Sequence, residues 1–181
     1  MNPRTSVGFV GCAVVAAFVG SGTVVRAGQG ASLVPPETLQ ALLPVPADWT
    51  KVSEKADQVA GSSGCDYTFA EVTYSREAMR VKITLADTGA AEASLMALAA
   101  MVISLPDDYL EKIPPATLVT RLKSAGFPAA ERWDGAKRDG DLTVLVGGRF
   151  VASLEGWHLA GVETLRGMLT QIDLKKLAEL K

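Results

Sequence analysis

The sequence predicts an α+β fold in which a single antiparallel sheet, built from hairpins, is covered by helices. Two segments, about 67–87 and 129–155, alternate apolar and polar residues around turn residues, which is typical of hairpins. Three others, about 91–104, 116–125 and 160–180, carry apolar residues in patterns that favour helices. Strands grouped in hairpins, with helices between the groups, indicate an antiparallel layer rather than alternating parallel βαβ units.

The first 27 residues have the features of a secretory signal peptide. Arg4 precedes an apolar run over residues 7–19, and Val25 and Ala27 occupy the two positions that signal peptidase recognises. The run is too short to span a bilayer, and no twin arginine is present. We therefore expect Sec-type export, cleavage near Ala27, and a periplasmic or extracellular destination.

The mature chain, residues 28–181, has the size of one domain with one core, and 28–35 has the composition of a flexible lead. The signal peptide removes two of the 18 basic residues and none of the 20 acidic ones, so the net charge changes from −2 to −4. This balance argues against nucleic acid as a partner, and no transmembrane segment is expected after signal removal. Cys12 leaves with the signal peptide, so Cys65 remains alone and no internal disulfide is expected.

Two short elements are expected before the first hairpin. Residues 35–44 predict a helix with Pro36 in its first turn. The stretch 47–52 is either a short strand or an extended arm, and the polar residues 53–64 are expected to form a loop.

The first hairpin should bury one face of its second strand. If residues 75–78 form a four-residue loop, Val72 faces Val81 on one side and Glu71 faces Lys82 on the other. The residues expected to be buried are Met79, Val81, Ile83 and Leu85.

The next two segments are expected to form helices. Residues 93–105 are apolar nearly all round, which predicts a helix that is buried on several sides or that lines an apolar cavity. The segment 116–125 follows a proline and ends before Gly126, which is a common helix terminator.

The stretch around Gly147 and Gly148 is compatible with a phosphate-binding loop or with a hairpin turn. The alternation on both sides favours the hairpin, because a tight turn needs positive φ angles that glycine adopts without strain. A two-residue turn would place Val146 opposite Arg149.

Upstream, the polar stretch 134–141 predicts a turn rather than a calcium loop, because its spacing lacks the terminal bidentate Glu.

Few residues carry recognisable chemistry. His158 is the only histidine, no nucleophile elbow is present, and two Cys or His side chains in the mature chain cannot make a zinc site. We therefore expect no catalytic residues, no cofactor and no metal. Trp133, Trp157 and His158 are the candidates for a ligand or partner surface, although tryptophans near loops more often close the ends of a core.

Two resemblances accompany these patterns. The string "VLVGGRFVASLEG…LRGMLTQIDLKKLAEL" resembles the C-terminal half of small exported bacterial proteins of unassigned function, and the order of elements is similar to the α/β/α sandwich of the PsbP and Mog1 group. Neither resemblance implies a catalytic residue.

The expected function is a non-enzymatic binding or accessory protein of the bacterial envelope, with an envelope protein or a small apolar ligand as its partner. The alternative is a hydrolase-like enzyme that uses His158 or an acidic residue in a cleft.

Overall fold

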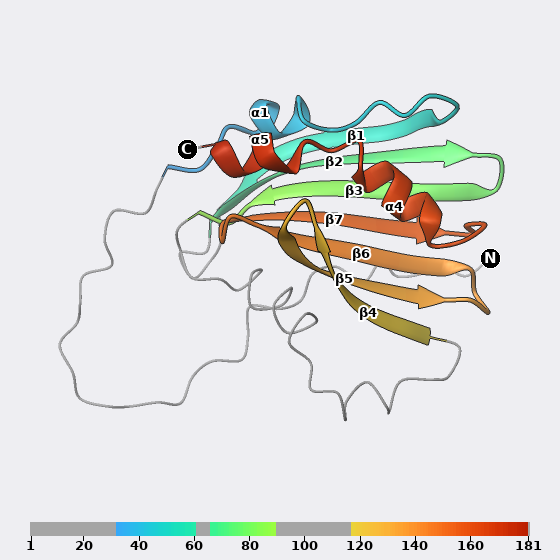
Figure 1. Cartoon of the computed structure of the whole chain (residues 1–181). Helices are drawn as coiled ribbons and strands as arrows, with labels where there is room; N and C mark the ends of the chain where they lie inside the picture. The colour runs from blue at the N-terminus through green and yellow to red at the C-terminus, as the bar shows by residue number, and fades with distance from the viewer. Residues whose placement is uncertain (1–31, 61–65, 90–116, 181) are drawn as a thin grey trace.

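The described part of the chain forms one seven-stranded antiparallel sheet. The computed structural model describes residues 32–60, 66–89 and 117–180. Figure 1 shows the strands in the order β1-β2-β3-β7-β6-β5-β4. Their bounds are β1 Thr50–Val59, β2 Tyr67–Arg76, β3 Met79–Asp87, β4 Thr117–Ser124, β5 Phe127–Asp134, β6 Asp139–Val146 and β7 Phe150–Trp157. The prediction of one antiparallel sheet that contains both hairpin regions is confirmed.

The first hairpin has a tighter turn than the sequence predicted. Arg76 lies opposite Met79, so only Glu77 and Ala78 connect β2 to β3, and Glu77 has a φ of 54°. The expected register, in which Val72 faced Val81, is wrong by two residues, because Val72 faces Ile83. A shift of two residues leaves every side chain on its expected face, since strand side chains alternate with a period of two.

The β6–β7 hairpin has a longer turn than the sequence predicted. Val146 lies opposite Phe150, so the turn consists of Gly147, Gly148 and Arg149, and both glycines have positive φ angles. The predicted pair of Val146 with Arg149 is therefore wrong, although the hairpin itself is confirmed.

The helix expected at 116–125 is wrong, because β4 occupies Thr117–Ser124. Ala125 and Gly126 have φ angles of 51° and 91° and turn the chain directly into β5. Gly126 thus serves a hairpin turn instead of a helix terminus. The loop expected at 53–64 is also wrong over most of its length, since β1 extends to Val59. The helix expected at 91–104 lies outside the described residues.

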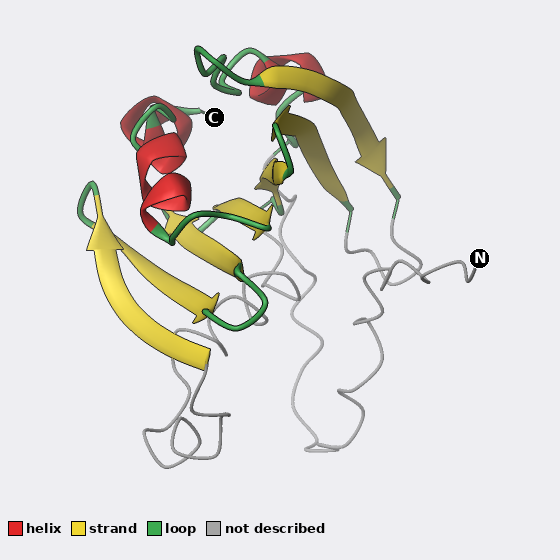
Figure 2. Cartoon of the chain, turned by 90° about the vertical axis from the view of Figure 1, so that its right-hand side faces the viewer, coloured by secondary structure: helices red, strands yellow, loops and turns green. Residues whose placement is uncertain are grey.

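Three short helices accompany the sheet in the described part of the chain. They are α1 Pro36–Gln40, α4 Glu163–Leu169 and α5 Leu174–Glu179. The helical region expected over 160–180 consists of α4 and α5, and Asp173 begins the second of them, because its side chain accepts a hydrogen bond of 2.9 Å from the backbone N–H of Lys176 and so caps α5. In Figure 2 the helices are seen on one side of the sheet, and their buried residues belong to the same core cluster as one sheet face.

The two faces of the sheet differ in composition. The face that packs against the helices, here called the core face, carries most of the buried apolar side chains. Among them are Val72, Val81, Ile83, Leu85, Leu142, Val144, Phe150 and Leu154. Val81, Ile83 and Leu85 are therefore buried as predicted, whereas Met79 is only partly buried. The opposite face, here called the polar face, carries the intervening residues of the same strands.

Candidate functional site

A row of charged side chains crosses the polar face from β3 to β5. Lys82, Glu155, Asp141 and Arg132 lie opposite one another on successive strands. The two central members are both carboxylates, which is unfavourable for directly paired residues. Each has a cation beside it, because Lys82 Nζ lies 2.8 Å from Glu155 Oε1 and Arg132 Nε donates to Asp141 Oδ1 at 2.7 Å. The hydrogen bond from Arg132 to Asp141 also raises the pKa of the arginine.

A row of hydroxyl groups runs beside the charged row. Thr84, Ser153 and Thr143 lie opposite one another on β3, β7 and β6. Thr84 Oγ1 is 3.5 Å from Glu71 Oε2, whereas the hydroxyls of Ser153 and Thr143 have no hydrogen-bond partner among the described residues. The centre of the polar face therefore offers free hydroxyls next to paired charges.

The charged and hydroxyl rows border a hollow of about 410 Å³ on the polar face. This volume falls within the range of roughly 300–1,000 Å³ that is usual for small-ligand sites. We call it the polar hollow. Its lining consists of Arg132, Asp134, Lys137, Asp139, Gly140, Asp141, Thr143, Ser153, Glu155, Gly156 and Trp157.

The β5–β6 turn forms one wall of the polar hollow. Asp134 Oδ1 accepts hydrogen bonds from the backbone N–H groups of Ala136 and Lys137 at 3.0 and 3.1 Å. Lys137 Nζ also lies 3.1 Å from Asp134 Oδ2. The backbone and side-chain hydrogen bonds from Lys137 lower the pKa of Asp134. The polar turn predicted at this position is confirmed, and Asp134 has a structural role in it.

Of the three candidate surface residues, Trp157 and His158 are neighbours at the end of β7. Trp157 lines the polar hollow and is partly exposed, and its indole N–H has no partner among the described residues. His158 is exposed and has a φ of 57°, and its backbone N–H donates to Asp139 Oδ1 at 3.1 Å. The imidazole of His158 is not part of the lining of the polar hollow.

Trp133 lies on the core face, across the sheet from Trp157. It faces Gly140, and a Cβ atom at position 140 would come within 2.8 Å of the Trp133 ring. Trp133 is partly buried and packs against the core cluster. The structure therefore brings Trp157 and His158 together and places Trp133 away from both.

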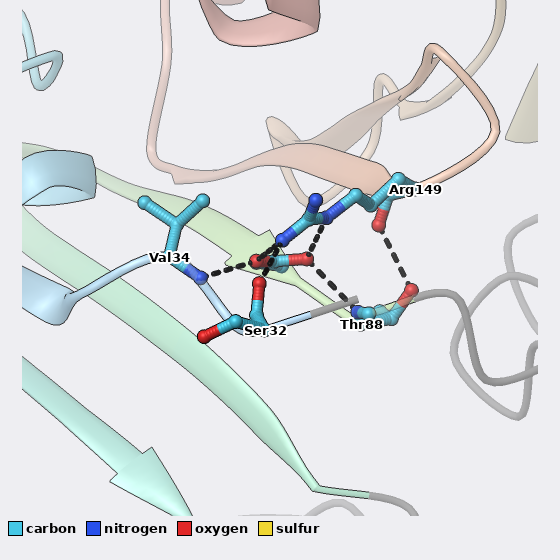
Figure 3. A network of polar contacts seen from close by, with 6 residues as sticks. Ser32, Val34, Thr88 and Arg149 are labelled. Carbon is cyan, nitrogen blue, oxygen red and sulfur yellow. Dashed lines mark hydrogen bonds and ion pairs between the residues drawn. The ribbon is translucent and has the colours of Figure 1, made fainter. Parts of the chain in front are cut away.

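A second group of polar residues surrounds the buried carboxylate of Asp87 (Figure 3). Arg149 Nε donates to Oδ1 and its terminal NH2 group donates to Oδ2, each at 2.7 Å. The backbone N–H groups of Val34 and Gly89 also donate to the carboxylate, at 2.7 and 2.9 Å. The same NH2 group of Arg149 donates to the backbone carbonyl of Ser32 at 2.7 Å. This hydrogen bond connects the segment before α1 to the β6–β7 turn.

The balance of forces on Asp87 favours its charged form. Burial raises the pKa of Asp87, but the hydrogen bonds from Arg149, Val34 and Gly89 lower it by more, and the net pKa is below the ordinary value. Because Arg149 already makes a two-pronged ion pair with Asp87, it does not supply a free cation behind the glycine pair. The phosphate-loop interpretation of this turn therefore has no support in the geometry.

A similar ion pair lies elsewhere on the core face. Glu131 on β5 is only 4% exposed, and both of its oxygens accept hydrogen bonds of 2.7 Å from Arg166 of α4. No pattern in the sequence predicts a role for Glu131 or Asp87. Their partners are 35 and 62 residues away, so no local pattern could reveal the pairs.

Within residues 32–60, 66–89 and 117–180, no group of three or more His, Cys, Asp or Glu side chains is arranged to hold a metal ion. None of the helices in these segments combines the length and the hydrophobicity of a membrane-spanning helix. Cys65 lies outside the described residues.

Comparison of the chain with protein-family models, with curated proteins and with solved structures gives no significant match. The site must therefore be interpreted from its own geometry. In the described part of the chain, that geometry presents two buried carboxylates held by arginines, which have a structural character, and an accessible hollow beside Trp157.

Proposed function

We propose that the chain is an exported, non-enzymatic binding or accessory protein of the bacterial envelope that acts through the polar hollow. The observation that carries this proposal is the concave site on the polar face, where Trp157 and two hydroxyls without described partners stand beside paired charges. Ligand sites are concave, and polar groups placed within them fix the orientation of the ligand. The other concentration of charge, around Asp87, is buried and has its hydrogen bonds satisfied within the protein.

Export is part of the proposal and rests on the N-terminal sequence. A short apolar run after Arg4, followed by small residues at the cleavage positions, supports removal of the first 27 residues. Intact-mass measurement of the protein from an envelope fraction should give a chain that begins near Gly28. A chain that begins at Met1, or a protein that fractionates with the cytoplasm, would contradict this part of the proposal.

Site-directed photocrosslinking in the native cell tests the binding role. A diazirine-bearing residue in place of Lys137, which lines the hollow and has 74% of its side chain exposed, should give a defined adduct, because this position borders whatever the hollow binds. The matched control is the same residue in place of Val45, which is 88% exposed and lies in the α1–β1 connection. Equal labelling at both positions, or no adduct at position 137, would contradict binding through the polar hollow.

The alternative function is a hydrolase-like enzyme, and one observation bears on it. Asp141 and Glu155 lie opposite each other in the hollow, and paired carboxylates are the catalytic groups of most glycosidases. Turnover of a glycoside or ester by the purified chain, abolished by Glu155→Gln or His158→Ala, would favour this alternative and exclude the binding role as the sole function.

A further inference from the structure

We infer that the polar hollow binds a neutral, polyhydroxylated ligand, that is, a sugar unit of a glycan. This inference deepens the proposed function and rests on it. It follows from three features of the hollow: the pairing of its charges, its free hydroxyls and the position of its tryptophan.

The charges in and beside the hollow are largely balanced within the protein. Lys82 is paired with Glu155, Arg132 with Asp141 and Lys137 with Asp134. The remaining carboxylate of the lining, Asp139, accepts the backbone N–H of His158. An anion would have to separate an arginine or lysine from its carboxylate, and a cation would have to displace one of these bases or bind at Asp139, the one lining carboxylate without a cationic partner among the described residues. A neutral ligand needs neither step, so it avoids the cost of breaking an ion pair.

The same groups can still bind hydroxyl groups. A carboxylate has two oxygens with about four acceptor positions, and a guanidinium has five N–H donors, so one ion pair leaves hydrogen-bonding capacity on both partners. Ser153 and Thr143 add hydroxyls that both donate and accept, and neither has a partner among the described residues. A sugar ring carries hydroxyls that also donate and accept, so it matches donors and acceptors that alternate over short distances.

Trp157 supplies the apolar part of the site. It is the only aromatic residue in the lining, and it lies at the end of β7 where the strand leaves the hollow. Tryptophan presents a large apolar ring together with an N–H group, which suits a ligand with an apolar face and a polar rim. The walls are otherwise polar or charged, so the hollow does not offer the surroundings that a small apolar ligand requires.

The inference can be tested by calorimetry and by ¹H–¹⁵N chemical-shift mapping on the purified chain. The probes are four neutral trisaccharides, built from glucose with α or β linkages, from mannose and from N-acetylglucosamine. Spermidine and a trimer of galacturonic acid serve as charged probes. At least one neutral trisaccharide should bind, with shifts confined to β5, β6, β7 and the 135–138 turn. Its affinity should change less than about twofold between low and high salt, because no ion pair forms.

Two variants and one control connect binding to the hollow. Trp157→Ala should weaken binding by at least tenfold. Thr143→Val keeps the shape of the side chain but removes a free hydroxyl, and it should weaken binding severalfold without loss of the fold. Trp133→Phe changes a tryptophan on the opposite face and should leave the affinity unchanged.

The possible results separate this inference from the proposed function. If no neutral trisaccharide binds while the photocrosslink at position 137 still forms with a protein, the sugar inference is wrong and the binding function remains. If only a charged probe binds, the inference that the hollow takes a neutral ligand is wrong. If neither the probes nor the crosslink gives a signal, both the inference and the proposed function fail.

Discussion

The two faces of the sheet accommodate charge in different ways. On the core face, Asp87 and Glu131 are 0% and 4% exposed, and each carboxylate accepts two hydrogen bonds from one arginine. On the polar face, Lys82, Glu155 and Asp141 keep roughly a quarter or more of their side-chain area in solvent. The same residue types therefore serve as internal connections on one face and as a hydrated surface on the other.

This difference shows which charges hold the fold together. A buried carboxylate loses its hydration, so it depends entirely on the groups that replace water. A partly exposed charge can exchange its ion-pair partner for water at little cost. Measured contributions of such pairs to the free energy of unfolding are therefore small. We therefore expect substitutions on the core face to affect stability strongly, and substitutions on the polar face to affect it weakly.

The largest effect should come from placing an unpaired charge on the core face. Val81 is fully buried between β2 and β7, opposite Tyr74 and Gly156. Val81→Asp should lower the free energy of unfolding by about 4–5 kcal/mol, because the new carboxylate has no cation or set of N–H groups arranged around it. Chemical denaturation followed by circular dichroism measures this change. A loss below about 1 kcal/mol would show that Val81 is accessible to water.

The next effect concerns the ion pair between Asp87 and Arg149. Asp87→Asn should cost about 3–5 kcal/mol, because it leaves a largely buried guanidinium without its counter-charge. The control is the double variant Asp87→Leu with Arg149→Met, which replaces both charges by apolar groups. The double variant should be more stable than Asp87→Asn alone, since neither buried charge remains. A double variant that loses the sum of the two single effects would show that the two residues do not act as a pair.

The same carboxylate should make stability depend on pH. The pKa of Asp87 in the folded chain is below its ordinary value, so its contribution is complete above the unfolded pKa of about 3.9 and is lost as the pH falls through the folded pKa. Denaturation curves recorded from pH 7 down to pH 2 should show this loss in the acid limb. The limb should be shallower in the double Leu and Met variant, which has no carboxylate to protonate at this position. An equally steep limb in both chains would assign the acid sensitivity to other groups.

The sequence predicted the faces of the strands better than it predicted their connections. The period-two alternation from Tyr67 to Asp87 placed Val81 and Lys82 on opposite faces, and they do lie on opposite faces. The turn was misjudged because a glutamate, Glu77, adopts a positive φ that the sequence does not signal. At the second hairpin, two glycines indicated a two-residue turn, but Arg149 also lies in the turn, where its side chain reaches Asp87.

One element, β4, was assigned to the wrong class, and another, β1, was missed beyond its first residues, which the stretch 47–52 offered as a strand or an extended arm. In β4, Leu118, Val119 and Leu122 are spaced so that both a helix and a strand accommodate them, and Gly126 fits either a helix terminus or a tight turn. In β1, an edge strand, most residues are exposed, so no apolar alternation marks it as a strand. The polar hollow was anticipated only through Trp157, because His158 is not part of its lining. Its charged row consists of residues from β3, β5, β6 and β7 that become neighbours only when the sheet forms.

The smallest effect is expected on the polar face, at Lys82. Its ammonium group lies 2.8 Å from Glu155 and 3.9 Å from Glu71, with 26% of the side chain exposed. Lys82→Ala should cost less than about 1 kcal/mol, because water replaces much of the lost interaction. The loss should shrink further in high salt, since salt screens the remaining repulsion between Glu155 and Asp141, which lie opposite each other. Arg80→Ala is the matched control, because Arg80 is exposed on the same face of β3 and has no ion-pair partner among the described residues. A loss at Lys82 as large as that at Val81 would place both side chains in the core, which the period-two alternation of β3 does not allow.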